Sequence, residues 1–399
     1  MSTPGPAGPI HRVDLPGGSS GPGLDVNDSR AFGVYVHVPF CRLRCDYCAF
    51  ATYTDRDRLM GAYVDACVIE LGRARSDEGI PAATSVYFGG GTPSRLPADA
   101  LVEILSAVPR VVGAEVTVEC NPEDVSASRL ATYRAGGVTR ISLGVQSTSP
   151  KVLRGLGRHG SERAGQAAAA VHDAGFESWS VDLMFGGPGE NDRDWEQSLA
   201  ESIDPPCSPP HLSAYALTVE PGTTLAAHPG RRPDDDVQAT RYERADHLLA
   251  AAGYQWEEIS NWARPGHRCR HNLLYWHQED YRGIGSAAHS HRAGRRWWNV
   301  RTPDRYIAAV TSGRLPTAGE EVLGPEQRRF EALALQLRTR SGVDADALPD
   351  HPDLAGLVYR EGGRAVLTVR GRLLANQVTT RLSTGPGHAV STGTLPPCA

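Results

Sequence analysis

The sequence of 399 residues contains no run of eighteen apolar residues, and this absence excludes a predicted membrane-spanning helix. Lysine is almost missing as well, because Lys151 is the only one and the remaining cationic side chains are arginines. A formal net charge of -5 indicates neither an acidic tail nor a basic surface for nucleic acid. We therefore expect no nucleic-acid partner and, at a membrane, peripheral contact only.

Residues 1–30 lack the apolar stretch of a secretion signal and are rich in proline, glycine and serine. This composition predicts a disordered tail over residues 1–30, because such a segment buries too little apolar surface to offset the entropy of ordering. We accordingly predict a cytoplasmic protein whose thiols stay reduced. The eight cysteines are then expected to be ligands or buried core residues, with no disulfide framework.

Short apolar, β-branched runs alternate with helix-like stretches from Ala31 onward. The expected strands are Gly33–Val38, Ser85–Phe88, Glu115–Glu119, Arg140–Val145, Trp179–Met184 and His211–Val219. The clearest expected helices are Leu59–Ala74, Ala98–Ala107, Glu162–Ala174 and Asp235–Ala252. Alternating strands and helices at this spacing predict an α/β fold with a parallel sheet. Six such units favour a partial (β/α)6 barrel over residues 31–254 rather than a full eight-fold barrel.

The character of the chain changes after about residue 254. Residues 255–320 are rich in tryptophan and histidine, and we interpret them as an added, partly β segment that leans on the barrel. Within residues 321–383, a helix is expected around Pro325–Arg338, and Val343–Leu382 then reads as a helix, two short strands with the turn EGGRAVLTVRG, and a final helix. That order is typical of a small winged-helix-like module. Residues 384–399 return to small polar residues and proline, and are predicted to be a frayed tail.

Nearly every unusual polar motif lies at or just after the carboxyl end of a predicted strand. CRLRCDYC follows the first strand, GGGTP the second, ECNPE the third and GVQS the fourth. Asp182 lies in the fifth strand and TVEPGT closes the sixth. In parallel α/β barrels this edge carries the active site, so the placement predicts one shared site.

The cysteines Cys41, Cys45 and Cys48 form a C-x3-C-x2-C pattern in the loop after the first predicted strand. Three neighbouring thiolates can hold a [4Fe–4S] cluster, which needs four ligands, and leave its fourth iron open. The alternatives are a zinc site, which normally needs a second distant pair of ligands, or buried thiols. The next cysteine, Cys67, falls inside a predicted helix and is expected to be a core residue.

The segment YVHVPFCRLRCDYCAF, residues 35–50, resembles the signature of the radical S-adenosylmethionine enzymes, and more narrowly of the oxygen-independent coproporphyrinogen III oxidase branch. The resemblance covers residues 31–382. It implies that S-adenosylmethionine chelates the open iron and that an electron donor feeds the cluster. Reductive cleavage would then yield a 5′-deoxyadenosyl radical, with the protein positioning the cofactor.

The same resemblance implies which side chains contact S-adenosylmethionine. Each position also has a plain structural alternative: a tight turn for the glycines, a half-buried aromatic for the tyrosine, and an internal salt bridge for the carboxylates. Buried carboxylates need such a partner because they are costly to desolvate. The predicted cofactor-binding residues are Tyr35, Gly90, Gly91, Thr92, Glu119, Gln146, Arg158 and Asp182.

Two features separate this chain from the oxidases of the branch. Ala49 and Phe50 follow Cys48, whereas the oxidases continue with Gly-Cys, and the oxidases carry an ordered N-terminal arm in place of a Pro/Gly tail. CRHNLLYW, residues 269–276, resembles instead the H-N-x-x-Y-W signature of the haem chaperones in this branch. This resemblance implies a haem carrier that serves respiratory haem proteins, without coproporphyrinogen oxidase activity. The alternative is an oxygen-independent coproporphyrinogen III oxidase.

His271 is the histidine of that signature and stands beside Asn272, Tyr275 and Trp276. Imidazole is a common axial ligand of haem iron, and flat aromatic side chains suit a porphyrin face. His271 is therefore the predicted haem ligand, with His289 and His267 as alternatives. The structural alternative is a histidine that only forms hydrogen bonds within a packed β segment.

Overall fold

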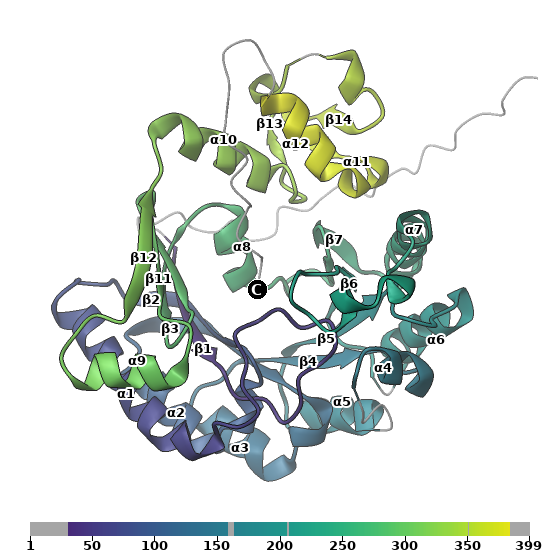
Figure 1. Cartoon of the computed structure of the whole chain (residues 1–399). Helices are drawn as coiled ribbons and strands as arrows, with labels where there is room; N and C mark the ends of the chain where they lie inside the picture. Colours follow the sequence, from purple (N-terminus) through teal and green to yellow (C-terminus); the bar gives the residue numbers. More distant parts are fainter. Residues whose placement is uncertain (1–30, 159–162, 206, 350, 384–399) are drawn as a thin grey trace, which may run out of the picture. The chain divides into compact units, whose positions relative to one another are not determined.

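The computed structural model describes residues 31–158, 163–205, 207–349 and 351–383. Both predicted tails, 1–30 and 384–399, and the expected first residue of the third helix, Glu162, lie outside the described residues. Within them, one large sheet has the strand order β12-β11-β10-β9-β1-β2-β3-β4-β5-β6-β8-β7 (Figure 1).

The centre of this sheet consists of the six predicted strands, which lie side by side in chain order and pair in parallel. Their apolar, β-branched sequences suit strands that are covered on both faces. The prediction of an α/β fold with a parallel sheet is thus confirmed in its broad form. The strands are β1 Phe32–Val38, β2 Ala83–Gly90, β3 Arg110–Cys120, β4 Arg140–Gln146, β5 Ser178–Phe185 and β6 His211–Ala216.

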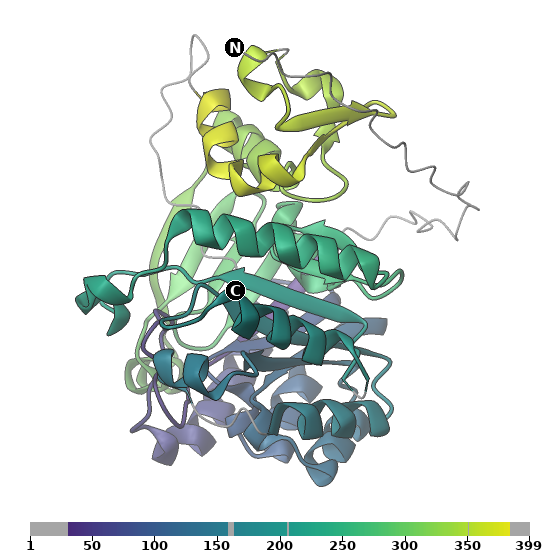
Figure 2. The ribbon, with the colours of Figure 1, turned by 90° about the vertical axis from the view of Figure 1, so that its right-hand side faces the viewer.

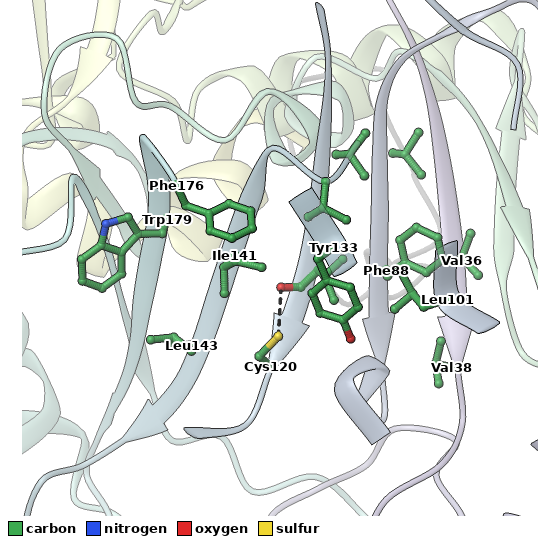
Figure 3. Close-up of a cluster of buried hydrophobic side chains, with 14 of the residues drawn as sticks. Val36, Val38, Phe88, Leu101, Cys120, Tyr133, Ile141, Leu143, Phe176 and Trp179 are labelled. Atoms are coloured by element: carbon green, nitrogen blue, oxygen red, sulfur yellow. Dashed lines mark hydrogen bonds between the residues drawn. The ribbon is translucent and has the colours of Figure 1, made fainter. Parts of the chain in front are cut away.

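Helices connect consecutive strands and bury their apolar sides against one face of the sheet (Figure 1). Figure 3 shows part of this core, where Val36 and Phe88 from the strands meet Leu101 and Tyr133 from the helices. Cys67 is fully buried in the first helix, as expected of a core residue. The helices are α1 Met60–Ser76, α2 Ala98–Ala107, α3 Ala127–Ala135, α4 Pro150–Gly155, α5 Ala164–Asp173, α6 Asp192–Ile203 and α7 Asp235–Ala251.

The aromatic-rich stretch after residue 254 does not form a separate layer, because its strands extend both edges of the same sheet. On one side β8 pairs antiparallel with β6, and on the other β9 pairs parallel with β1. Pairing satisfies the backbone groups that β1 and β6 would otherwise leave exposed. These elements are β7 Gln255–Glu258, β8 Asn261–Ala263, β9 Asp280–Ile284, β10 His289–Arg292, β11 Arg295–Asn299, α9 Pro303–Thr311 and β12 Thr317–Val322.

The HNLLYW motif forms a helix, α8 Arg270–Trp276, where a packed β segment was one expectation. Glu115 of β3 explains this difference, since its carboxylate accepts hydrogen bonds from the backbone N–H groups of Arg270 (3.1 Å) and His271 (2.9 Å). A carboxylate at this position satisfies donors that the first turn of a helix leaves unpaired. The contact joins residues more than 150 positions apart, so a local sequence pattern cannot predict it.

The C-terminal part has its own small core and a three-stranded antiparallel sheet of order β13-β15-β14. The predicted hairpin is present, with Gly362 and Gly363 at positive φ in its turn. The helix expected from Val343 to the hairpin is wrong, because this stretch forms the short strand β13, which pairs with β15, and two 3-10 turns. In Figure 2 this part is drawn in yellow-green tones. Its elements are α10 Pro325–Gln336, β13 Val343–Asp344, β14 Val358–Glu361, β15 Arg364–Leu367, α11 Val369–Leu373 and α12 Ala375–Ser383.

No helix of the described ranges has both the length and the apolar character needed to cross a membrane.

Candidate functional site

The three predicted cluster cysteines lie in one loop that leaves the carboxyl end of β1. The loop is closed by backbone hydrogen bonds from Cys41 to Tyr53 (3.1 Å) and from Cys48 to Cys45 (3.2 Å). Cys41 is buried, whereas Cys45 and Cys48 are half-buried. The three thiols therefore share one edge of the sheet, as their sequence positions predicted.

The electrostatics of this loop indicate what the thiols require. Burial raises the pKa of Cys41 to about 11 and also raises the pKa of Cys45, which Arg158 partly offsets. The charges of neighbouring thiolates contribute to both rises, so nearby positive charge favours the ionised forms of Cys41 and Cys45. Among the described residues, no three His, Cys, Asp or Glu side chains lie close enough together to hold a single metal ion, and this includes the three cysteines. Three soft sulfur donors spread along one loop suit an iron–sulfur cluster.

The glycine-rich turn after β2 packs directly on the cysteine loop. Gly91 donates its backbone N–H to Val38 O (2.8 Å), and Thr92 donates to Phe40 O (2.9 Å). A Cβ atom on Gly91 would lie 2.7 Å from Val38 O and 3.1 Å from Cys41 Sγ, so a side chain is excluded there. Glycine at this position thus permits the close approach that a backbone contact to a cofactor also needs.

A chain of polar contacts runs from the cysteine loop across the ends of three strands. The Thr92 hydroxyl lies 3.5 Å from Cys41 Sγ, and Asn121 Nδ2 donates to Thr92 Oγ1 (3.3 Å). Arg158 donates to Asn121 Oδ1 (2.9 Å) and to Gly144 O (3.0 Å). Asn121 was missed as a site residue, although its place directly after β3 in ECNPE was a usable signal.

Gln146 ends β4 with a φ of 67°, in the left-handed region that non-glycine residues seldom occupy. The pairing of β4 with β5 shifts register between Gly144 and Gln146. Residues with strained backbone conformations of this kind cluster at active sites and ligand-binding sites. The irregular backbone places Gln146 at the same edge as Arg158 and the cysteine loop.

The two predicted carboxylates lie in the interior, on neighbouring parts of the same face. Glu119 accepts a hydrogen bond from the hydroxyl of Tyr87 (2.8 Å), and burial raises the pKa of Glu119 to about 7. Asp182 accepts hydrogen bonds from Ser142 and Ser213, both at 2.7 Å, while burial raises its pKa. Among the described residues, no ion pair within hydrogen-bond distance is found for either carboxylate, although the charge of Arg140 partly offsets the rise in the pKa of Asp182.

Tyr35 is held by a histidine that the sequence analysis did not single out. The Tyr35 hydroxyl lies 3.1 Å from His37 Nδ1, and His37 Nε2 lies 3.1 Å from Ala51 O. Burial lowers the pKa of His37 to about 4, so the ring is neutral. Because a carbonyl only accepts, Nε2 carries the proton and Nδ1 accepts from Tyr35. The signal was present, since residues 35 and 37 share a face of the strand.

His271 is fully buried, and both of its ring nitrogens have partners. Nδ1 lies 2.8 Å from Ser85 Oγ and Nε2 lies 2.9 Å from Tyr275 Oη. Burial lowers the pKa of His271 to about 3. This geometry matches a histidine that forms structural hydrogen bonds. By contrast, His289 is exposed and stacks on Trp298 with ring centroids 5.6 Å apart, while His267 is half-buried.

A cavity of about 180 Å³ lies between α8 and the β6–β8 edge of the sheet. Asn272, Tyr275 and Trp276 of the motif line it, together with Tyr215 and Glu258. Burial raises the pKa of Glu258 to about 7.

Comparison with known proteins gives a consistent result. A model of the radical SAM superfamily matches residues 35–201. The chain is 43% identical to the heme chaperone HemW of Mycobacterium tuberculosis, over 90% of this chain and 97% of that protein. It is 38% identical to the heme chaperone HemW of Escherichia coli, over 71% and 74%. The fold is similar to that of E. coli coproporphyrinogen III oxidase (HemN), with a TM-score of 0.76 over 89% and 90% of the chains, at 22% identity.

Proposed function

The chain belongs to the HemW family of haem chaperones, which are radical SAM proteins, and from this membership we propose that it binds haem and passes it to haem-accepting respiratory proteins. The observation that carries the proposal is the 43% identity to a haem chaperone over nearly the whole length of both chains. Ala49 and Phe50, in place of the Gly-Cys of the oxidases, also support a carrier over an oxidase.

The finer architecture belongs to the same proposal. We assign residues 31–254 to the partial (β/α)6 barrel of the superfamily, with strands β1 to β6 as its wall. Residues 255–320 then complete both edges of that wall, and residues 321–383 form a winged-helix-like module. The order and parallel pairing of β1 to β6 support the first assignment.

Membership in the radical SAM superfamily implies a [4Fe–4S] cluster and S-adenosylmethionine. Cys41, Cys45 and Cys48 would hold the cluster, and the cluster when bound supplies the electron that cleaves the sulfonium of S-adenosylmethionine. Thr92 would hold Cys41 in place through its hydroxyl, which in turn accepts a hydrogen bond from Asn121.

The remaining side chains of the site would bind and orient S-adenosylmethionine. Arg158, whose planar guanidinium is fixed by two acceptors, suits a carboxylate. Glu119 and Asp182 suit ribose hydroxyls or an ammonium group, since both are buried carboxylates whose hydrogen-bond partners in the described structure are hydroxyl groups. The Tyr35 hydroxyl donates a hydrogen bond to His37, so the lone pairs of the Tyr35 oxygen remain available to accept hydrogen bonds from the ligand. Gly90 and Gly91 would contact the ligand through their backbone groups, since the space that a side chain would take is filled by His37 and by the cysteine loop.

Of the three candidate haem ligands, His289 best meets the requirements of axial ligation, because its side chain is exposed and beside an indole ring. His271 would have to give up a hydrogen bond to Ser85 or Tyr275 before it could bind iron. We propose His289 ahead of His271 for this reason.

Haem titration of the anaerobically reconstituted protein tests the proposal. The wild type is expected to develop a Soret band and to bind haem saturably. His289→Ala should shift or weaken that band, and His271→Ala serves as the comparison. A wild-type protein that gives no Soret band, or only the spectrum of free haem, would contradict haem binding itself.

A further inference from the structure

Four aromatic rings connect α8 with the cysteine loop, on the face of β1 and β2 opposite the helix core. The ring of His271 stacks on Tyr87, with centroids 5.2 Å apart and planes at 24°. Tyr87 stacks on Tyr35 at 6.4 Å and 24°, and Tyr35 is hydrogen-bonded to His37. We call these four residues the aromatic column.

Glycines on the two strands make room for this column. A Cβ atom on Gly33 would lie 3.2 Å from the ring of His271. A Cβ atom on Gly89 would lie 2.9 Å from the ring of Tyr87 and 3.2 Å from that of Tyr35, and a Cβ atom on Gly90 would collide with the His37 ring. Since each step of the column faces a residue without a side chain, the rings fill space that the strands leave open.

The aromatic column is fixed at His271, its end farthest from the cysteine loop, and its second ring, Tyr87, is hydrogen-bonded to a carboxylate. His271 is anchored through both ring nitrogens, to Ser85 and to Tyr275. Tyr87 lies against its face and donates its hydroxyl proton to Glu119 Oε1 at 2.8 Å. Displacing His271 would therefore free the Tyr87 ring and loosen the hydrogen bond that orients Glu119.

We propose that His271 is a positioning residue for the S-adenosylmethionine site, which fixes Tyr87 and, through it, Glu119 and Tyr35. The inference rests on the proposed function, because it takes Glu119 and Tyr35 as contacts of that cofactor. It gives the HNLLYW helix a task at the cofactor end of the sheet, distinct from ligation of haem iron.

Glu119 offers a readout that a merely structural role would not change. The titratable groups that face it are Tyr35, Tyr87, Asp182 and Tyr215, from four other strands. Burial and Asp182 raise the pKa of Glu119, while the hydrogen bond from Tyr87 lowers it. Removing the Tyr87 hydroxyl therefore raises this pKa further and moves ionisation of Glu119 to higher pH.

The experiment measures S-adenosylmethionine affinity of the cluster-loaded protein as a function of pH, from the cofactor-induced change in the EPR signal of the reduced cluster. Tyr87→Phe keeps the stacked ring and should weaken binding about tenfold near neutral pH. In Tyr87→Phe, the midpoint of the pH dependence of S-adenosylmethionine binding should move to higher pH. His271→Ala should weaken binding similarly, and His271→Phe, which restores a stacked ring, should recover part of the loss. Tyr133→Phe, a buried tyrosine of α3 outside the column, should behave as wild type.

The outcomes separate this inference from the function on which it rests. If S-adenosylmethionine leaves the spectrum of the cluster-loaded wild type unchanged, the proposed function fails. If the wild type responds and Tyr87→Phe and His271→Ala show unaltered affinity and pH midpoint, the positioning role is wrong. His271→Phe, which keeps a ring against Tyr87 and loses the hydrogen bonds to Ser85 and Tyr275, decides the matter if His271→Ala does not fold: wild-type affinity and pH midpoint in this variant would contradict the anchoring role.

Discussion

The hydroxyl of Thr92 lies 3.5 Å from Sγ of Cys41, so the turn after β2 directly contacts the first of the three cysteines proposed to hold the cluster. The same hydroxyl accepts a hydrogen bond from Asn121, which in turn accepts one from Arg158. Residues from the ends of three strands and from one connecting loop thereby support a single edge of the cysteine loop. This chain of contacts links two of the predicted cofactor residues, Thr92 and Arg158, to the cysteine loop.

Iron content tests the role of the three cysteines. Anaerobic reconstitution should yield about four irons per chain, because three local thiolates and one open position suit a [4Fe–4S] cluster. Cys41→Ala, Cys45→Ala and Cys48→Ala should each abolish this loading. Cys67→Ala is the matched control, since Cys67 is buried in α1 beside Tyr306. Equal dependence on Cys67 would contradict the assignment.

The interior carboxylates should matter for the cofactor and leave the cluster unaffected. Glu119→Gln and Asp182→Asn keep the side-chain shape and remove the charge, and each should weaken S-adenosylmethionine binding by about tenfold or more. Measured iron content should stay at the wild-type level. Loss of iron together with cofactor binding would show that these residues support the fold of the loop instead.

Much of the central fold could be predicted from the sequence, because each central strand is a short β-branched run, bounded by turn residues, whose apolar side chains pack against the helices. The edges of the sheet could not be predicted. Strand β9 pairs with β1, which is far away in the sequence, and the sequence of β9 itself contains charged and aromatic residues. The helical form of HNLLYW depends on Glu115, a contact of the same long range. The periodicity of a short sequence window cannot predict contacts between residues so far apart in the chain.

The site shows the same division. Cys41, Thr92, Glu119 and the other motif residues were expected together because each follows or ends a strand at one edge. His37 could be placed beside Tyr35 from the sequence, because the two share a face of β1, but its role as a hydrogen-bond acceptor depends on Ala51 O, which only the fold brings to Nε2.

A buried ion pair next to β5 should contribute strongly to stability. Arg241 and Glu190 are 6% and 0% exposed and lie 2.7 Å apart. Arg241→Ala leaves the Glu190 carboxylate buried without its cation and should lower the free energy of unfolding by about 3–5 kcal/mol. Arg244→Ala removes an exposed pair with Glu196 and should cost less than about 1 kcal/mol. Equal effects in denaturant titrations would contradict this argument.

Coproporphyrinogen III distinguishes a carrier from an oxidase. Under reducing, anaerobic conditions with S-adenosylmethionine, the cluster-loaded protein should form no protoporphyrinogen, since Ala49 and Phe50 replace the Gly-Cys of the oxidases. The radical SAM oxidase HemN of E. coli is the positive control, because it shares the fold. Turnover at even stoichiometric yield would favour the oxidase alternative.

Transfer of haem tests the central claim most directly. The haem-loaded, cluster-containing protein is mixed with membranes that carry a haem-depleted respiratory protein, and the Soret spectra of the two separated fractions are followed over time. A haem carrier should lose its Soret band as the acceptor gains the spectrum and activity of its holo form, and His289→Ala should deliver less haem. Haem that stays on the protein, or reaches the acceptor no faster than free haem does, would contradict the account.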